Sequence, residues 1–513
     1  MAPCERLSRA VVATTEPVHE PFSAARALRA ASVAIALTLY IALGAASTII
    51  YPPVGALFLL PVIMGVIMIA PRARAAPRSV VLSLLAIAAF LLPLWPAYLF
   101  IKFGPAPALI PPRIVLYAVS GIWAYDMVFS PLRRAQFILA ARKGGATAGL
   151  FFILFALGLF SLPFAEGRSI AAPEYFRQLI IWLAPFCAVI TYCRRQRDFV
   201  LLIRWLTLSA VPVAFIAIAE SASHQLLAGI LSPYIADDAD WLRNVQELKI
   251  RDGAFRAQAT HTHPLSLGEH LAFAAPFALA FAVSAKRHPS RILWIAGFAA
   301  IILAAIATNS RGAIIVMILS VGAMAGLMAW RLIRRASASR WRPLAGLAFL
   351  CLLAASPVAV AVGYGVVSGK GGVSAANSTQ SRIDQIEMAW PKILKRPIGG
   401  YGTGRSARVL GYWGRTLTLD NYYLTLALDY GFPGPAAFFA MMIAWASGSL
   451  RRSARSHHQL SVIYLAMFAS ALSIATGRTI ISQAGNLSVI YFMIAAFAGA
   501  SVSFSHRRSR NRI

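Results

Sequence analysis

The sequence predicts an all-α membrane protein, a polytopic transmembrane helix bundle of about fourteen spans with two long loops that contain amphipathic helices. Composition gives the first reason: of 513 residues, 59% are hydrophobic and only 13% are charged, whereas soluble domains carry about 25% charged residues. The second reason is that long apolar stretches recur along the chain, and each could cross a hydrocarbon layer of ~30 Å as a helix. Such stretches are too long for barrel strands, and backbone in lipid must satisfy its own hydrogen bonds.

The apolar stretches divide the chain into successive segments. We expect a tail over 1–30, transmembrane helices over 31–219, a first long loop over 220–267, helices over 268–365, a second long loop over 366–420, helices over 421–504 and a basic tail over 505–513. The spans are predicted near 31–50, 53–70, 79–101, 113–130, 146–165, 179–192, 199–219, 268–284, 292–307, 313–330, 343–365, 421–449, 459–476 and 485–504. The sixth stretch is short and the twelfth is long, so about twelve to fourteen spans fit the pattern.

Lysine and arginine set the predicted orientation, because cytoplasmic connections carry an excess of both. Alternate connections are the basic ones, among them 71–78, 131–145 and 331–342, which places both termini in the cytoplasm and both long loops outside. The net charge of +30 is then a topology signal and a contact with anionic lipid, with no nucleic acid as partner. Residues 1–30 lack the apolar core of a signal peptide.

Each long loop carries apolar residues at helical spacing. They are Trp241, Leu242, Val245 and Leu248 in the first loop and Ile383, Ile386, Trp390 and Ile393 in the second. Both patterns predict an amphipathic helix on the outer membrane surface, and Pro391 is expected to bend the second one. No clear internal repeat is present, which disfavours transporters built from inverted repeats.

Arg311 lies between two apolar runs in the stretch ATNSRGAIIVMILS, at the predicted outer end of a span. One interpretation is an interfacial anchor whose guanidinium reaches the headgroups. The other is a ligand site, because the outer side is poor in cations and Ser310 and Gly312 leave the guanidinium accessible. An arginine fork suits a phosphate or diphosphate at headgroup depth.

A second polar segment, 251–270, holds Arg256, His261, His263 and His270. Surface or helix-capping roles are the simpler interpretation of the histidines. Two histidines near an arginine could also transfer protons, because histidine titrates near neutral pH. Metal binding is disfavoured, since no HExxH-like frame is present, and the four cysteines suggest neither a disulfide framework nor a zinc site.

Two further segments close the second long loop. The glycine-dense stretch 397–404 lacks the Lys-Ser/Thr of a nucleotide-binding loop and is interpreted as a flexible turn at a site entrance. Asp420 and Asn421 stand at a helix start, where a capping role is one interpretation. Tyr422 and Tyr423 suit either an interfacial aromatic belt or stacking on sugars.

In this order, these segments resemble the O-antigen ligase and O-antigen polymerase family of bacterial envelope proteins, over roughly residues 250–440. The matching residues are Arg256 with His263-Pro264, Ser310-Arg311-Gly312, Arg382, Trp390, Pro397 with Gly400, Gly402 and Gly404, and Asn421, Leu424, Gly431 and Gly434. The chain departs from the family at Asp420, where the family has a histidine thought to help activate the acceptor. Either Asp420 acts with a pKa raised above its usual ~3.9, or His261 or His263 takes the role, or this member differs in activity.

The resemblance implies glycosyl transfer at the periplasmic face of the inner membrane, without metal or other cofactor. The donor would be a glycan on undecaprenyl diphosphate, and the acceptor a hydroxyl of lipid A core or of another glycan. The catalytic residues implied are Asp420, Arg311, Arg256 and His263. The substrate-binding residues implied are Arg382, Asn421, Ser310, Trp390, Tyr422, Tyr423 and His261.

Four functions remain open at this point. A ligase transfers the finished glycan to lipid A core, whereas a polymerase extends O-antigen or exopolysaccharide repeats, and the two differ only in acceptor. Transfer to protein is a third, less favoured choice of acceptor. The last is a non-enzymatic flippase or transporter of lipid-linked glycans, which should instead place its cations in a central cavity and keep short loops.

Overall fold

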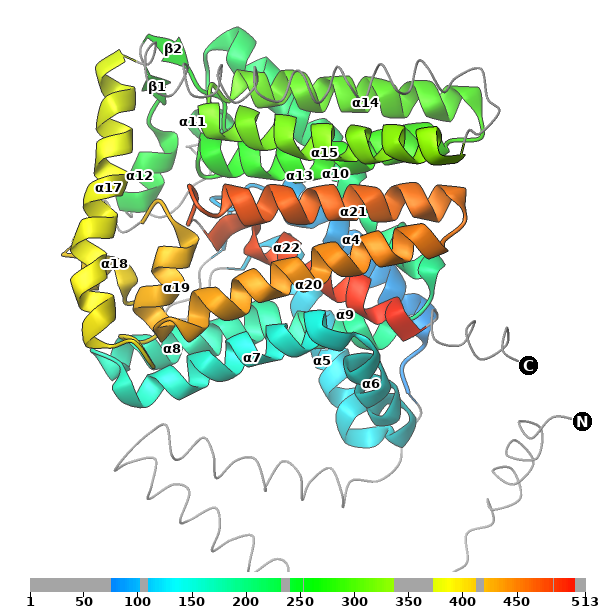
Figure 1. The fold of residues 1–513 in the computed structure, drawn as a ribbon, viewed down its shortest axis with the longest axis horizontal. Helices are drawn as coiled ribbons and strands as arrows, with labels where there is room; N and C mark the ends of the chain where they lie inside the picture. The colour runs from blue at the N-terminus through cyan, green and yellow to red at the C-terminus, as the bar shows by residue number, and fades with distance from the viewer. Residues whose placement is uncertain are drawn as a thin grey trace, which may run out of the picture. The chain divides into compact units, whose positions relative to one another are not determined.

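The computed structural model describes residues 75–101, 109–231, 240–251, 253–335, 372–411, 419–482 and 484–502 (Figure 1). The spans predicted near 31–50, 53–70 and 343–365, together with both predicted tails, lie outside the described residues.

The described part of the chain is almost entirely helical, which confirms the all-α prediction. The helices of its first half are α4 (Arg78–Leu94), α5 (Pro111–Phe129), α6 (Pro131–Lys143), α7 (Gly145–Ser161), η1 (Leu162–Phe164), α8 (Arg168–Gln178), η2 (Leu179–Leu183), α9 (Ala184–Tyr192), α10 (Gln196–Ser223), α11 (Leu227–Ile230) and α12 (Asp240–Gln246). Those of its second half are α13 (Pro264–Ser284), α14 (His288–Ala307), α15 (Arg311–Arg335), α17 (Gly372–Lys395), α18 (Ser406–Val409), α19 (Tyr422–Tyr430), α20 (Pro433–Arg455), α21 (His458–Gly477), η4 (Ala484–Asn486) and α22 (Leu487–Gly499). A short antiparallel hairpin joins β1 (Ile250–Arg251) to β2 (Ala254–Phe255).

Within the described ranges, seven helices are long and apolar enough to cross a membrane, or eight if one bent pair forms a single span. They are Gly145–Phe164, Arg168–Tyr192, Gln196–Ser223, Pro264–Ser284, His288–Ala307, Arg311–Arg331 and Gln459–Gly477. The bent pair is α5 and α6, between which the chain bends by 111°, and α4 and Ala484–Gly499 are apolar but shorter. The chain is therefore a helical membrane protein, and the total of about fourteen spans stays a prediction.

Two predicted spans have other boundaries in the structure. The span predicted at 179–192 is part of a longer helix from Arg168, whose first turns are too polar to stand out by hydropathy. The span predicted at 421–449 is divided into α19 and α20, because Gly431 takes a φ of 76° and ends α19. Pro433 then opens α20, at the first helical turn that tolerates proline.

Helix α13 lies at the centre of the described bundle. It is almost wholly buried and packs against α10, α14, α15 and α21. Small residues permit this close packing, as is common between membrane helices: a Cβ on Gly268 would collide with the Cβ of Ala313 on α15. Polar side chains on α13 are therefore enclosed by protein on every side.

Helix α17 lies across one end of the bundle, where α13, α15 and α19 begin and α21 ends (Figure 1). We call this the α17 end. The helix buries Gln385, Ala389 and Ile393. On a neighbouring face of the helix, which we call its exposed apolar sector, four apolar side chains are exposed: Ile383, Ile386, Trp390 and Leu394. The predicted amphipathic helix is thus present and continues through Pro391, although only Ile393 of its predicted apolar stripe is buried.

Candidate active site

Most predicted site residues belong to segments that contact one another at the α17 end. These segments are the turn before α13, the corner between α14 and α15, the first turn of α19, the end of α21 and part of α17. All of these segments except the end of α21 were predicted separately from the sequence to carry site residues, and the structure brings them into contact.

Arg256 is attached to the α14–α15 corner. Its Nε donates to the carbonyl of Thr308 at 3.3 Å, and the neighbouring Ala257 N–H donates to the carbonyl of Ala307 at 3.1 Å. Burial, followed by the nearby charge of Arg251, lowers the pKa of Arg256 to about 10. The guanidinium therefore remains charged at neutral pH although its residue is only 9% exposed.

Ser310 and Arg311 form the start of α15. Asn309 turns the chain with a φ of 46°, and the buried Ser310 hydroxyl accepts from the Ala313 N–H at 3.4 Å as a helix cap. Arg311 follows as the first helical residue and is half-buried. A Cβ on Gly312 would collide with Ile480, so the absence of a side chain there lets α15 approach the end of α21. Arg311 consequently lies beside the turn that contains Arg478.

Asp420 is held by two side chains of α17. Its carboxylate lies 3.7 Å from Arg382 Nε, and its backbone N–H donates to Gln385 Oε1 at 2.9 Å. Asn421 caps α19, because its side-chain oxygen accepts from the Leu424 N–H at 3.2 Å. The capping role considered for this pair thus belongs to Asn421, and the Asp420 carboxylate faces Arg382. Burial raises the pKa of Asp420, while Arg382 partly opposes that rise.

The two predicted histidines have different surroundings. His263 caps α13 by accepting from the Leu265 N–H at 3.1 Å, and burial, aided by the charges of Arg256 and Lys249, lowers its pKa to about 3. His261 is buried, with Nδ1 3.3 Å from Thr260 Oγ1. Burial lowers the pKa of His261 to about 4, and its hydrogen bond to Asn486 opposes that change. Both imidazoles are therefore neutral at pH 7.

The aromatic candidates do not form one sugar platform. Tyr422 is buried, with its hydroxyl 3.2 Å from that of Tyr491, and Tyr423 donates to the carbonyl of Ala475 at 3.0 Å. Trp390 is 52% exposed, and its ring centroid lies 6.0 Å from that of Phe432. It stands ~12 Å further along α17 than Arg382, by the rise of a helix, so the structure separates Trp390 from the other candidates.

A buried ion pair that the sequence analysis missed connects these segments. Arg478 contacts both oxygens of Glu269, at 2.8 and 2.9 Å, and both side chains are fully buried. Asn486 donates to the same carboxylate at 2.8 Å and to the carbonyl of Ser266 at 2.7 Å. Arg478 also lies 5.2 Å from the Tyr422 ring centroid, and its carbonyl accepts from the Tyr422 N–H at 2.9 Å.

This set of Glu269, Arg478 and Asn486, called the Glu269 network below, joins the ends of α13, α21 and α22 to the start of α19. His261 contacts the network through Asn486. A signal for it was present in the sequence, since Glu269 lies inside a predicted span and ionisable residues in such spans are rare and usually paired. Nothing in the sequence identified Arg478 as its partner, because 209 positions separate them.

Behind Tyr422 lies a cavity of about 150 Å³. A second cavity of about 170 Å³ contains Arg113 and Arg177 in its lining. The two share Gln178, Trp182 and Ala484 as lining residues. The shared wall includes η2, a single π-helical turn, and such turns occur frequently at functional sites.

The glycine-dense stretch packs around the end of α19. The N–H groups of Gly404, Arg405 and Ser406 donate to the buried Asp429 carboxylate at 2.9 to 3.1 Å. Gly400 lies so close to the Asp429 backbone that a Cβ would collide with it. Three backbone donors that could bind phosphate are thus occupied by Asp429, and the stretch fixes the end of α19.

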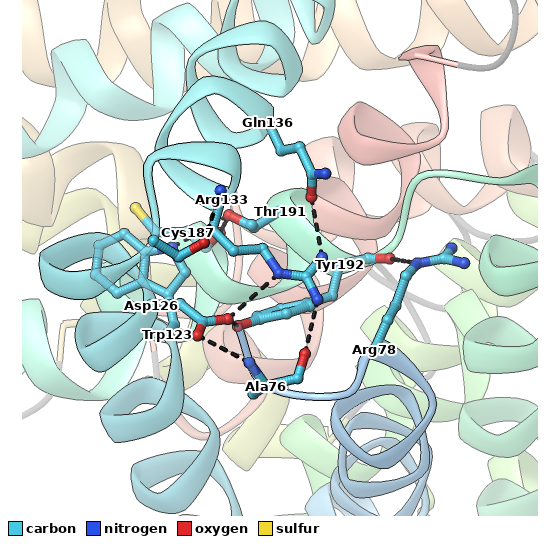
Figure 2. Close-up of polar contacts among 10 residues, drawn as sticks. Ala76, Arg78, Trp123, Asp126, Arg133, Gln136, Cys187, Thr191 and Tyr192 are labelled. Atoms are coloured by element: carbon cyan, nitrogen blue, oxygen red, sulfur yellow. Dashed lines mark hydrogen bonds and ion pairs between the residues drawn. The ribbon is translucent and has the colours of Figure 1, made fainter. Parts of the chain in front are cut away.

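A second buried polar cluster lies where the end of α5 and the start of α6 meet the end of α9 (Figure 2). Arg133 is 3.3 Å from the carboxylate of the fully buried Asp126 and donates to the carbonyl of Ala76 at 2.7 Å. Asp126 also accepts from Tyr192 at 2.5 Å and from the Ala76 N–H at 3.0 Å. Its groups are engaged with one another, and the cluster stabilises the α5–α6 bend against α9.

Comparison with known proteins agrees with the motifs. Residues 296–439 match the family model described as O-antigen ligase. No curated protein matches the chain. The matched range includes the Ser310-Arg311-Gly312 motif, all of α17, and the Asp420-Asn421 pair. Residues 296–439 are therefore similar to the O-antigen ligase family, and they lie within a membrane helix bundle.

Proposed function

We propose that this protein is a metal-independent glycosyltransferase that moves a glycan from undecaprenyl diphosphate to an acceptor hydroxyl at the periplasmic face of the inner membrane. The acceptor of the favoured reaction is lipid A core, which makes the protein an O-antigen ligase. Both termini are then cytoplasmic, and the α17 end faces the periplasm.

The Arg382–Asp420 ion pair carries this proposal. Asp420 is the candidate base and Arg382 a candidate anion-binding residue, and 38 positions separate them in the sequence. The Arg382 Nε lies 3.7 Å from the Asp420 carboxylate, in a half-buried position beside the first turn of α19. Half-burial strengthens their mutual interaction without removing access for a substrate. Arg256 and Arg311, at one corner of the same end, supply two further guanidinium groups for a diphosphate.

The mechanism follows from competition for Arg382. A bound diphosphate would draw the guanidinium toward its own oxygens and weaken the contact with Asp420. The pKa of Asp420, which burial raises and Arg382 lowers, would then rise further, making its carboxylate a stronger base. Donor binding would thus prepare the base that orients or deprotonates the acceptor hydroxyl.

In the transfer step, the acceptor oxygen attacks the anomeric carbon and forms the new C–O bond. The bond from that carbon to the diphosphate oxygen breaks, and its electron pair leaves with undecaprenyl diphosphate. The hydroxyl proton passes to Asp420 and then to water. Arg256, Arg311 and Arg382 stabilise the charge that develops on the leaving group. Because a diphosphate leaves readily, positioning contributes more than strong acid–base help.

Deletion of the gene and complementation with variants tests the proposal. A ligase predicts loss of long glycan from the lipid A core together with accumulation of lipid-linked polymer. A single repeat unit left on the core would instead identify a polymerase. The Arg311→Ala variant should fail to restore the glycan, whereas Arg291→Ala, an exposed arginine at the other end of the bundle, should restore it.

Two results would contradict the proposal. Normal glycans on complementation with Arg311→Ala would remove the catalytic claim. Accumulation of undecaprenyl-linked glycan on the cytoplasmic face alone would favour the flippase.

A further inference from the structure

Helix α20 ends far from the α17 end (Figure 1). Residues at this end of α20 line a large cavity. Its volume is about 810 Å³. It is formed by the end of α6, the starts of α7, α10 and α21, and the ends of α20 and α22.

The rim of this cavity is cationic. Lys143, Arg451 and Arg455 are exposed around it, and the residues that line it include neither aspartate nor glutamate. Arg452 is fixed in the wall, with its guanidinium 3.6 Å from the Phe497 ring centroid and donating to the carbonyl of Phe497 at 2.6 Å. Several positive charges thus surround one hollow, which favours occupation by a group with more than one negative charge.

Small residues form much of the remaining lining of the cavity. Gly144, Gly145 and Ala146 form one side, and Ala444 and Gly448 of α20 form part of another. Because Ala444, Leu460 and Phe497 line the cavity together with the cations, a ligand that fits has both a charged part and an apolar part. A free phosphate lacks the apolar part, whereas a phospholipid has both.

The position along the bundle also favours a lipid. Residues of three predicted cytoplasmic connections, 131–145, 193–198 and 450–458, contribute to the lining. Basic pockets between transmembrane helices on the cytoplasmic side are typical sites for anionic lipid headgroups. We infer that this cavity binds the headgroup of an anionic phospholipid, best one with two phosphates such as a diphosphatidylglycerol, and that the lipid joins the start of α7 to the ends of α20 and α22.

The test measures lipid binding to the purified full chain in detergent, by native mass spectrometry and thermal unfolding. The probes are diphosphatidylglycerol, phosphatidylglycerol, phosphatidylcholine and inorganic phosphate. The site predicts the tightest binding and the largest rise in Tm for diphosphatidylglycerol, with affinity falling as salt screens the charges.

The Arg451→Gln/Arg455→Gln double variant should bind diphosphatidylglycerol about thirtyfold more weakly, from the usual contribution of a basic residue near anionic lipid. Both arginines are exposed, so the variant should fold, which circular dichroism checks. The matched control is Arg287→Gln/Arg291→Gln, which also removes two exposed arginines from the same end but outside the lining, and it should bind as the wild type does.

Three outcomes would overturn the inference. Equal weakening in the control pair would mean general surface attraction. Equal binding of phosphatidylcholine would mean an apolar site without headgroup selection. Saturation by inorganic phosphate at the affinity of the lipid would identify a free-phosphate site. None of these results bears on glycosyl transfer, which depends on the other end of the molecule.

Discussion

Asp420 is the residue on which the proposed chemistry depends most. A base must be ionised to act, and burial raises the pKa of this carboxyl group, so activity should fall with acidification at a higher pH than for an exposed aspartate. Asp420→Asn should lose most activity, and Asp420→His should retain activity with a pH midpoint moved toward the ~6.5 typical of histidine. Transfer rates of reconstituted protein across pH provide the measurement.

A full rate in Asp420→Asn would restrict this residue to positioning. Gln385→Ala serves as the companion variant, since it removes the side chain that accepts from the Asp420 N–H without altering a charge. It should lower the rate while leaving the pH midpoint unchanged.

For the buried Glu269–Arg478 ion pair, we predict an effect on the stability of the fold. Glu269→Gln would leave a buried guanidinium without a counter-charge, and removing one partner of such a pair costs ~3–5 kcal/mol. Thermal unfolding in detergent should therefore show a large fall in Tm. Glu247→Gln changes an exposed glutamate and should have little effect. Equal Tm values for the two variants would contradict the role given to the Glu269 network.

These residues also indicate how far the sequence could be interpreted. Arg311 and Asp420 were identifiable because they stand at predicted helix ends, whereas Arg256 and Arg382 were identifiable through the motifs of the family. The sequence could not show that Asn421 is the helix cap and that Asp420 forms the ion pair, because either side chain can cap a helix. Arg478 was missed because its meaning depends on Glu269, and no local pattern connects positions that distant in the chain.

At the scale of elements, the start of α13 depends on a neutral histidine. Free His263 titrates near 6.5, whereas burial lowers its folded pKa to about 3. The unfolded chain therefore binds the proton first, and stability contributed by this cap should be lost progressively as the pH falls below 6.5. His263→Asn keeps a capping group without titration. Hydrogen exchange of the first turn of α13 should rise at pH 5 in the wild type and less in the variant.

Helix α17 should contact lipid through its exposed apolar sector. A polarity-sensitive fluorophore on Ile386→Cys should report an apolar surrounding in liposomes, whereas the same label on Asp384→Cys should report water. Both positions are exposed, so labelling itself is comparable. Identical spectra from the two sites would mean that α17 lies away from the bilayer. The helix and its location within the second long loop were predictable from periodicity, but the face that packs on α19 was not, because Gln385 is polar and Ala389 is only weakly apolar.

At the scale of the whole molecule, the bundle is organised by close contacts of α13. A Cβ on Gly268 would collide with Ala313, whereas nothing lies within 4 Å of a Cβ on Gly322 of α15. Gly268→Val should therefore destabilise the protein by at least ~1–3 kcal/mol, the usual cost of overpacking, and Gly322→Ala should be tolerated. Yield and Tm after purification measure both. Composition predicted the all-α membrane class directly, but which helix is central depends on packing that hydropathy does not report.

The π-helical turn between the two cavities has a consequence for insertions and deletions. Such a turn accommodates one surplus residue within a helix while the flanking turns keep their phase. Deletion of the exposed Ile180 should thus convert the π-helical turn into regular α-helix that continues from α8 into α9. Helices α8 and α9 should keep their present packing. The hydrogen bond of 3.1 Å from Trp182 to Ser488 would be lost, and the partition between the cavities would change shape. A shortened protein that folds normally but transfers glycan poorly would fit this expectation; one that fails to fold would contradict it.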